Sequence, residues 1–367
     1  MKILEIKGLK YYYPILSDSF KKQINSVKAV ENIDLTIRRG ECLGIVGESG
    51  CGKTTLGKTI IRLFRPTDGK IVFYHKNQKN VDISVLSQKE LKKNRIRAKL
   101  QMIFPNSFTS FNPKMLVKDI ITEPILLSKK ISKKELEKKA LSLLKIVELD
   151  NSYLNKHPHN FSGGHRQRIA ITRAIATNPE LIVLDEPTSA LNVFGQTQIL
   201  NLLQDLHKRF NLTFLFFTQH LPVAKYISDR IAVMYLGKII EIAKTNEFFN
   251  NPIHPYTITL LSGVSAAYKK IGKKIVLERD VPNPINPPRG CKFHTHCPFC
   301  LDKCVKTEPP LGFFGKEHKV ACHRKIEIKK LVKKRFGVSF TKPKVKKTKL
   351  KRIRNKATKA SQNKKNK

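Results

Sequence analysis

Apolar and polar positions alternate along the first forty residues of the chain. The stretches ILEIKGL, near the N-terminus, and VENIDLTI, just before Arg39 and Gly40, repeat every two residues, as strands with one buried face do. Three tyrosines, Tyr11 to Tyr13, follow the first stretch and precede a proline. The pattern predicts that the chain begins with antiparallel β-strands.

A different pattern starts at residue 42. The continuous apolar run CLGIV (residues 42–46) leads into the glycine-rich sequence GESGCGKTT, and residues 56–64 then carry apolar side chains at helical spacing. Apolar strands recur at LIVLD and LTFLFFTQH, helical patterns occur at RQRIAITRAIAT and GQTQILNLLQDLHKRF, and RIAVMYLGKIIEI is typical of a hairpin. This alternation of strands and helices predicts an α/β fold.

The segment between the glycine-rich loop and LIVLD differs again. Short strands are predicted at residues 71–74 and 101–104, and the patterns within residues 117–146 are helical. We therefore expect an inserted helical subdomain over about residues 106–175.

Length and hydropathy limit the class of protein. The 367 residues are enough for two or three units and for an ordinary core. The longest dense apolar run, Leu212 to Phe217, is far below the roughly 18 residues that span a bilayer, and the opening MKILEIKGLK lacks a secretory apolar core. We expect a soluble chain with a cytoplasmic location.

Basic residues far outnumber acidic ones. The sequence contains 71 Lys and Arg against 28 Asp and Glu, a net charge of +43. Residues 324–367 carry 20 basic residues and one acid, Glu327. Because they have few large apolar side chains to bury, residues 326–367 are predicted to form a disordered basic tail. Contact with anionic lipid, nucleic-acid binding and a solvated tail without a partner are the alternatives.

The glycine-rich loop matches the phosphate-binding P-loop over its whole length. Small residues let backbone N–H groups turn toward the β- and γ-phosphates of ATP, a lysine neutralises the phosphates, and a hydroxyl holds Mg²⁺. A strand before the loop and a helix after it are the context that the motif requires. The predicted nucleotide-binding residues are Gly47, Glu48, Ser49, Gly50, Cys51, Gly52, Lys53, Thr54 and Thr55.

Two acids end the apolar run LIVLDE at residues 181–186. Their position places both carboxylates at the carboxyl end of a strand, the edge at which α/β sheets bind ligands. Together with the P-loop they predict a magnesium–nucleotide site. We expect Thr54 and Asp185 to hold Mg²⁺ and Glu186 to polarise the attacking water.

The sequence FSGGH at residues 161–165 lies between the P-loop and these acids and opens a basic helix. Here residues 1–262 resemble the ATP-binding cassette (ABC) family, whose signature LSGGQ occupies this place. The resemblance implies an ABC-type P-loop ATPase cassette, with a RecA-like core, an antiparallel β subdomain and an inserted helical subdomain.

The same resemblance implies roles for further residues. The signature would cap the γ-phosphate of ATP bound to a second cassette, so one cassette cannot work alone. His220 would contact the γ-phosphate, and Tyr13, or its neighbour Tyr12, would stack on adenine. The implied catalytic residues are Lys53, Glu186 and His220, and the implied signature contacts are Ser162, Gly163 and Gly164.

Further motifs narrow the resemblance to one group of importers. SFNPKM at residues 110–115, EP at 123–124, HPH at 157–159 and HPYT at 254–257 are similar to the ATP-binding subunits of oligopeptide and dipeptide permeases. The opening LKYYYPI is more similar to the second, F-type, ATPase subunit. The resemblance implies a peptide importer at the cytoplasmic face of a bacterial membrane. Its partners would be a different second ATPase, two membrane permease subunits and a substrate-binding lipoprotein.

Two alternative functions stay open at this point. Nickel import occurs within the same family, because substrate choice lies in other subunits. A non-transport cassette protein that binds nucleic acid through its basic tail is the rival from another class. Such proteins generally carry two cassettes, whereas this sequence contains one P-loop, so nucleic acid is the less favoured partner.

Five of the seven cysteines fall within 32 residues. A Pro/Gly-rich stretch at residues 281–290 precedes all five, and we expect a small Cys-rich module over residues 263–325. In a cytosolic chain such a cluster favours metal over disulfides. Iron–sulfur, tetrahedral zinc and free buried thiols are the alternatives. The resemblance implies a [4Fe–4S] cluster on Cys291, Cys297, Cys304 and Cys322.

Three positions depart from the family pattern. The Q-loop glutamine, which in the family meets Mg²⁺ and couples to the membrane subunit, is Pro105 here, which has no side-chain donor or acceptor. The signature glutamine is His165 and the D-loop aspartate is Asn192, and both can still form hydrogen bonds. The ATP site completed by a partner cassette must therefore tolerate these two residues.

Overall fold

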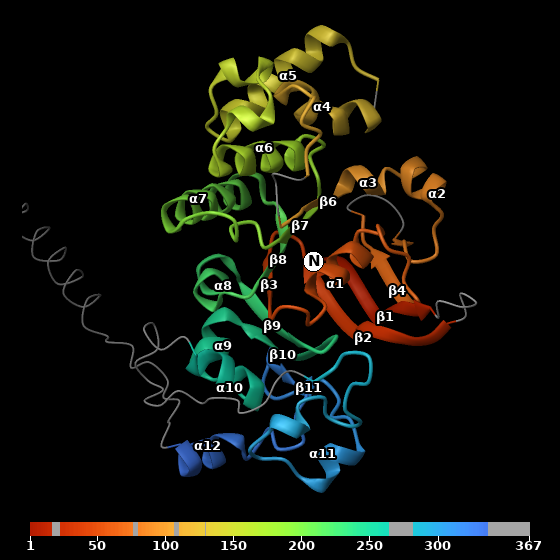
Figure 1. Ribbon diagram of the computed structural model, residues 1–367, viewed down its shortest axis with the longest axis vertical. Coiled ribbons are helices and arrows are strands. Elements are labelled where there is room, and N and C mark those ends of the chain that lie inside the picture. The colour runs from red at the N-terminus through yellow and green to blue at the C-terminus, as the bar shows by residue number, and fades with distance from the viewer. Residues whose placement is uncertain (17–22, 76–79, 106–109, 129, 264–281, 337–367) are drawn as a thin grey trace, which may run out of the picture.

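Two β-sheets lie between a helical subdomain at one end of the molecule and a C-terminal module, residues 282–325, at the other (Figure 1). Residues 264–281 of the predicted Cys-rich module and 337–367 of the predicted tail lie outside the described part of the chain, as do residues 106–109 of the predicted helical subdomain. The computed structural model describes residues 1–16, 23–75, 80–105, 110–128, 130–263 and 282–336.

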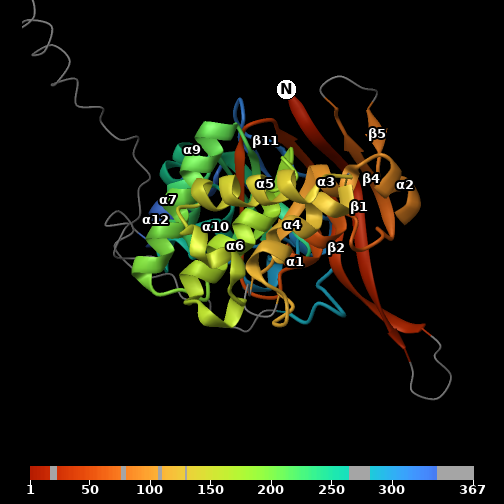
Figure 2. The same ribbon diagram turned by 90° about the horizontal axis from the view of Figure 1, so that it is seen from above.

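The first sheet is antiparallel, as the alternating pattern predicts. β1 (Lys2–Leu16) and β2 (Gln23–Arg38) form a long hairpin that projects from the body of the molecule (Figure 2). β4 (Asp68–Phe73) and β5 (Val81–Asp82) complete the order β2-β1-β4-β5. Apolar residues of β1 and β2 bury one face of this sheet against the helix that follows the P-loop.

Within the described residues, the second sheet has eight strands in the order β11-β12-β10-β9-β3-β8-β7-β6. Its central strands are parallel, and β9 and β10 form the predicted hairpin. Every residue of β3, β7 and β8 is buried, which explains their uninterrupted apolar sequences. The bounds are β3 (Cys42–Val46), β6 (Leu100–Ile103), β7 (Leu181–Asp185), β8 (Thr213–Thr218), β9 (Arg230–Tyr235) and β10 (Lys238–Lys244).

The helices cover this second sheet and connect its strands. The helix after the P-loop, α1, is shorter than residues 56–64 predict at its C-terminal end, because the chain turns after Ile60 and Arg62 takes a positive φ. The remaining bounds are α1 (Lys53–Ile60), α2 (Gln88–Lys93), α3 (Ile96–Lys99), α7 (Val193–Phe210), α8 (Leu221–Ile227), α9 (Thr245–Asn250) and α10 (Pro255–Ser262).

The predicted helices of the helical subdomain are present as a compact group. Their apolar faces form one cluster with the neighbouring part of the main sheet. A capping box starts α5, in which Ser132 and Glu135 each accept a hydrogen bond from the other's backbone N–H. The bounds are α4 (Val117–Ser128), α5 (Lys133–Ile146), the 3-10 helices η1 (Asn151–Asn155) and η2 (Pro158–Asn160), and α6 (Gly163–Ile175).

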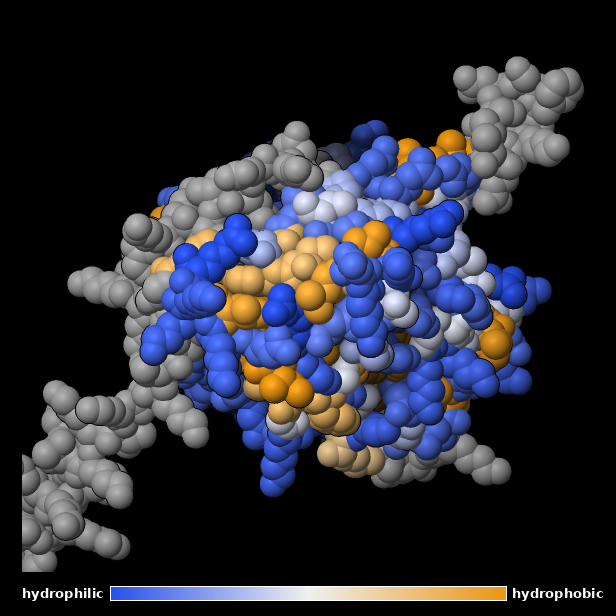
Figure 3. Space-filling model, turned by 90° about the horizontal axis from the view of Figure 1, so that it is seen from below, coloured by the Kyte–Doolittle hydropathy of each residue, from blue (hydrophilic) through white to orange (hydrophobic). Residues whose placement is uncertain are grey.

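The C-terminal module is built onto the main sheet. β12 (Lys319–Val320) pairs antiparallel with β10 and with β11 (Gly312–Phe313), while η3 (His294–His296) and α11 (Asp302–Lys306) lie outside the sheet. Seen from below, this end of the molecule shows apolar surface among hydrophilic side chains (Figure 3). The exposed apolar side chains of the module are Leu301, Val305, Phe313 and Ile326.

The prediction of a disordered tail from residue 326 is wrong for its first part. Residues Ile328–Phe336 form helix α12, and Ile328 and Val332, one turn apart, are fully buried against the C-terminal module. The tail begins with apolar residues at helical spacing, whose burial offsets the cost of ordering the lysines between them. The prediction for residues 337–367 lies outside the described residues.

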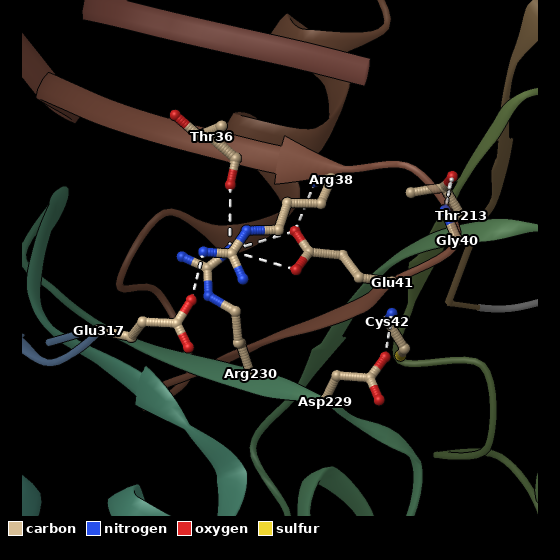
Figure 4. Close-up of polar contacts among 9 residues, drawn as sticks. All are labelled: Thr36, Arg38, Gly40, Glu41, Cys42, Thr213, Asp229, Arg230 and Glu317. Carbon is tan, nitrogen blue, oxygen red and sulfur yellow. Dashed lines mark hydrogen bonds and ion pairs between the residues drawn. The ribbon is translucent and has the colours of Figure 1, made fainter. Parts of the chain in front are cut away.

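A polar network joins the two sheets and the module (Figure 4). Arg230, the first residue of β9, donates to both carboxylate oxygens of Glu41 at 3.2 Å and to the carbonyl of Thr36 at 3.3 Å. The backbone N–H of Arg38 donates to Glu41 at 2.6 Å, and its guanidinium pairs with Glu317 of the module at 2.6 Å. The ends of β2, β3 and β9 are thereby tied to the C-terminal module.

Candidate functional site

Parallel strands bring the predicted site residues to one edge of the main sheet. β3 ends at Val46, whose register partner in β8 is Thr218, and β7 ends at Asp185, whose partner in β8 is Phe217. The P-loop therefore lies beside the residues that follow β7 and β8. The structure brings the P-loop to the same edge as Asp185, Glu186 and His220.

The backbone of the P-loop requires glycine at two positions. Gly52, the N-cap of α1, has φ +109°, and a Cβ there would lie 2.1 Å from the carbonyl oxygen of Ala29. A Cβ on Gly47 would lie 2.3 Å from the carbonyl oxygen of Met234 in β9. The loop is thus packed from behind by β2 and β9, which leaves its open side for a ligand.

Lys53, the first residue of α1, holds its ammonium group inside the loop. Its Nζ donates to the carbonyl oxygens of Gly47 at 2.8 Å and Glu48 at 2.9 Å. The thiol of Cys51 is 3.7 Å away, and burial raises its pKa above the ordinary range. A protonated, buried thiol supports the view of Cys51 as a loop residue and not as a nucleophile.

Asp185 fits a magnesium ligand. Its side chain is buried, and neither carboxylate oxygen has a hydrogen-bond partner among the described residues. Burial raises the pKa of Asp185, although the nearby Thr54 hydroxyl acts in the opposite direction without reaching hydrogen-bond geometry. A buried carboxylate without a partner is costly unless a cation compensates it.

Glu186 and His220 lie beside Asp185 in less buried positions. Glu186 has φ +45°, an uncommon conformation for a residue with a Cβ, and its N–H donates to the carbonyl of Phe217 at 3.0 Å. His220 is exposed and starts α8, with its N–H donating to the Thr218 hydroxyl at 3.0 Å. Both side chains are therefore accessible to a nucleotide at this edge.

Of the two candidate tyrosines for adenine stacking, Tyr13 lies nearer the P-loop helix. Its hydroxyl is 3.1 Å from the Thr55 hydroxyl in α1, and its ring packs edge-on against Tyr11 at 4.9 Å. Tyr12 lies on the other side of the strand, where its hydroxyl donates to Glu31 at 2.9 Å. Of the two, Tyr13 is therefore the one whose hydroxyl contacts the helix after the P-loop.

The signature residues lie in the helical subdomain, at the start of α6 (Figure 1). Ser162 caps this helix by accepting from the N–H of His165, and its hydroxyl is 3.1 Å from the imidazole Nδ1 of the same residue. A Cβ on Gly163 would lie 3.2 Å from the side chain of Leu191, the residue before Asn192 of the D-loop. The structure therefore does not place the signature in this chain's own P-loop site.

Pro105 and Asn192, the other two departures from the family pattern, lie close to the end of β6 and at the start of α7. Pro105 is exposed in a bend just after β6. Asn192 is the N-cap of α7, where its side chain accepts from the N–H of Gly195 at 2.9 Å. Asparagine is among the best N-cap residues, so this substitution keeps the D-loop joined to a stable helix start.

The four cysteines predicted as metal ligands line one small cavity of about 10 Å³. Burial raises the pKa of Cys291 and Cys297 to about 12 and that of Cys322 to about 11, while the fifth cysteine, Cys300, is exposed. Within the described residues, no group of three or more His, Cys, Asp or Glu side chains is arranged to hold a metal ion. The thiols are gathered in one place without forming a closed coordination site.

Sequence reasoning misses one contact to the P-loop. The backbone N–H of Glu48 donates to the hydroxyl of Tyr256 in α10, at 3.4 Å. In the sequence, Tyr256 stands out only as part of HPYT, a mark of the importer group. No periodicity in the sequence indicates that α10 contacts the P-loop.

No helix among the described residues is long and apolar enough to cross a membrane.

Comparisons with known proteins show the family of this chain. The ABC transporter family profile matches residues 30–189, and the profile of the oligopeptide/dipeptide transporter C-terminal region matches residues 240–304. The chain is 46% identical over 324 residues to the oligopeptide transport ATP-binding protein AppF of Bacillus subtilis (strain 168), which covers 88% of this chain and 97% of the relative. The putative oligopeptide transport ATP-binding protein YkfD of the same strain is 41% identical over 339 residues, 91% of this chain and 99% of the relative.

A solved structure gives the same result for the cassette. The ATP-binding cassette MJ0796, as a dimer in a post-hydrolysis state bound to ADP and Pi, matches with a TM-score of 0.57 and 30% identity. The match covers 66% of this chain and 99% of that one. With a P-loop, paired acids and a strand-end histidine at one sheet edge, the chain belongs to the ABC transporter ATP-binding family, in the group with an oligopeptide/dipeptide transporter C-terminal region.

Proposed function

We propose that this chain is the ATP-hydrolysing subunit of a bacterial ABC importer for peptides, bound to the cytoplasmic face of the membrane through its partners. The main support is that the P-loop, Asp185, Glu186 and His220 lie at the same edge of the main sheet. The names of AppF and YkfD support peptides as the cargo. They do not favour nickel or nucleic acid.

The residues of the site divide the work of hydrolysis. Lys53 and the loop amides would hold the β- and γ-phosphates, and Tyr13 would stack on adenine. Mg²⁺, when held by Thr54 and Asp185, supplies positive charge to the phosphates. Glu186 would orient the attacking water and His220 would contact the γ-phosphate. Catalysis then rests on positioning and electrostatics.

The site needs a second cassette, for which a different ATPase subunit is the proposed partner. Ser162, Gly163 and Gly164 lie in the helical subdomain and not beside this chain's P-loop. In the proposed dimer they would cap ATP held by the partner, whose site must accept His165. Co-purification of the chain with a second ATPase and two membrane subunits after mild solubilisation tests the assembly. Recovery of the chain alone under those conditions would contradict the proposal.

A cleft of about 450 Å³ between β6 and the helical subdomain is the proposed contact for the membrane subunits. Phe104, Phe111 and the 68% exposed Leu127 give it apolar walls, and Arg97 and Arg173 line it as well. Such a mixed groove suits the apolar face of a short amphipathic helix. Contact there would pass motion between the membrane subunits and the helical subdomain.

We expect Leu127→Asp to lower co-purification with the membrane subunits at least tenfold, because it places a charge on the apolar wall. Binding of ATP to the isolated chain should not change. Val85→Asp is the matched control, since Val85 is 70% exposed and does not line the cleft. Equal recovery of both variants with the membrane subunits would place the docking surface elsewhere.

We propose that Cys291, Cys297, Cys304 and Cys322 hold a [4Fe–4S] cluster, with zinc as the alternative. The support is that all four thiols line one cavity. Metal ligands must be thiolates, and a bound cation would lower the pKa values of thiols that burial alone raises. The side chains would have to move apart to admit the cluster, since the cavity is small.

Anaerobic purification should give a brown protein, and Cys297→Ser or Cys322→Ser should remove most of the visible absorption. Cys300→Ser is the control, because Cys300 is exposed and does not line the cavity. Iron and zinc are measured in the same samples. Colourless wild-type protein with one zinc per chain would leave only the zinc alternative, and metal-free folded protein would exclude both.

The basic tail is proposed to contact anionic lipid. Each lysine or arginine near an anionic leaflet contributes on the order of 1 kcal/mol before screening. Deleting residues 342–367 should reduce sedimentation with anionic vesicles at low salt without changing ATP hydrolysis by the assembled complex. Tight RNA binding that the deletion abolishes, without any vesicle binding, would contradict this.

A further inference from the structure

Three aromatic residues form a buried block between the P-loop and the cysteine cavity. Tyr235 ends β9, Tyr256 lies in the first turn of α10, and Phe293 belongs to the C-terminal module. The ring centroids of the two tyrosines are 4.5 Å apart, and Phe293 is 5.5 Å from each. All three are at most 3% exposed. We call this group the aromatic block.

One end of the aromatic block contacts the P-loop. The backbone N–H of Glu48 donates to the hydroxyl oxygen of Tyr256 at 3.4 Å. Burial is the main cause that raises the pKa of Tyr256, and the Glu48 carboxylate adds to it, so the hydroxyl stays neutral. Glu48 is the second residue of the loop that would surround the phosphates, so its backbone position affects every amide that follows.

The other end of the block belongs to the cysteine cavity. Phe293 follows Cys291 by two residues, and both line the cavity together with Cys297 and His254. His254 starts α10 and accepts the N–H of Tyr256 through its Nδ1 at 3.1 Å. The cavity wall and the residue that holds the P-loop are therefore parts of one packed unit.

Different elements hydrogen-bond to the two ends of the P-loop. The β9–β10 turn holds the other end of the P-loop, where the N–H of Gly237 donates to the carbonyl of Cys51 at 2.9 Å. The Glu48 end projects beyond β3, where Tyr256 is the side chain from outside the loop that bonds its backbone N–H. Loss of that bond would loosen the Glu48 end, whose carbonyl still accepts from Lys53 at 2.9 Å, and leave the other end in place.

We propose that Tyr256 is a positioning residue for ATP binding, which fixes the P-loop at Glu48 and is itself held in place by Phe293 of the C-terminal module. This inference rests on the proposed function of the P-loop as the ATP site. The C-terminal module would then support the nucleotide site. A shift of Phe293 in the cavity wall would displace Tyr256, and through it the P-loop backbone at Glu48.

The size of the effect follows from the bond involved. Removing a single hydrogen bond of this kind changes the equilibrium constant that depends on it by roughly two- to tenfold. Because Tyr256→Phe keeps the ring and its packing, the variant should fold normally and lose only the contact to Glu48. We expect the Kd for ATPγS with Mg²⁺ to rise by this factor.

The experiment measures ATPγS binding to the purified full chain by calorimetry, alongside the thermal midpoint of each variant. Tyr256→Phe, Phe293→Leu and the double variant are compared with wild type. Tyr226→Phe is the control for the loss of a tyrosine hydroxyl bond, since it removes an exposed hydrogen bond from α8 to Asn201 of α7 and no bond to the P-loop. Ile199→Val controls for general destabilisation, because Ile199 is a fully buried residue of α7.

Weaker binding in Tyr256→Phe and Phe293→Leu, with a double variant no worse than the stronger single one, would support the inference. Unchanged affinity in Tyr256→Phe would overturn it. The inference would also be overturned if the variants lost no more affinity than Ile199→Val loses for a comparable fall in thermal midpoint. If wild type fails to bind ATPγS, the proposed function is wrong and this inference falls with it, whereas wild-type binding with unaffected variants overturns the inference alone.

Discussion

Glu186→Gln is expected to lower ATP hydrolysis by the assembled transporter roughly 10²- to 10⁴-fold while Mg²⁺–ATP binding is kept. The amide preserves the shape of the side chain but cannot accept a proton from the attacking water. Glu186 has φ +45° and is fixed by its N–H bond to Phe217 in β8, so the backbone should keep its position in the variant. Hydrolysis and nucleotide binding are measured on the same complex.

Glu148→Gln is the matched control for this experiment. Glu148 also has a positive φ, +57°, and its carboxylate pairs with Arg168 on the surface of the helical subdomain at 3.0 Å. Its amide variant should hydrolyse ATP at close to the wild-type rate. Near-normal hydrolysis in Glu186→Gln would show that another group orients the water or that this site is idle in the complex.

Glu241→Ala is expected to destabilise the chain by about 3–5 kcal/mol, the cost of breaking a buried charged contact on one side. Glu241 lies in β10 with no exposed surface and accepts the N–H groups of Ile253 at 2.9 Å and His254 at 2.8 Å. The imidazole Nε2 of His318, itself 3% exposed, is 2.7 Å away. Alanine would leave all three of these groups buried without a partner.

Urea unfolding of the full chain measures this loss of stability. Glu308→Ala is the control, because Glu308 pairs with Lys238, the first residue of β10, at 2.6 Å but is 48% exposed. That variant should lose only about 0–1 kcal/mol, as exposed ion pairs do. Equal losses in the two variants would show that the buried carboxylate does not hold the module to the sheet.

The fold of the cassette could be predicted because its signals are local. Buried parallel strands such as β3 and β7 read as continuous apolar runs, and the P-loop chemistry is specific to its eight residues. The meeting of Asp185 with the P-loop follows from strand order alone, since ligand sites lie at the carboxyl ends of such strands. The sequence therefore predicts most of the candidate site.

The contacts of the C-terminal module could not be predicted in the same way. β11 and β12 have two residues each, too few for a periodic signal, and Glu241 shows no sign in the sequence that it is buried. In α12, lysines surround Ile328 and Val332, so the helical spacing of these two apolar residues is weak in the sequence pattern. The bond between Glu48 and Tyr256 is a long-range contact that depends on the finished fold.

The pairing of β12 with β10 has a consequence for the edge of the main sheet. Lys319–Val320 covers the outer rim of β10, whose inner residues are all buried and largely apolar. A rim strand left bare exposes a row of N–H and C=O groups to which any other chain can add. A chain truncated after Ser262 would lack β12, would leave this edge of β10 unpaired, and would tend to aggregate. By pairing with Glu241 and Ile242, the module leaves fewer backbone groups of β10 open to pairing with another chain.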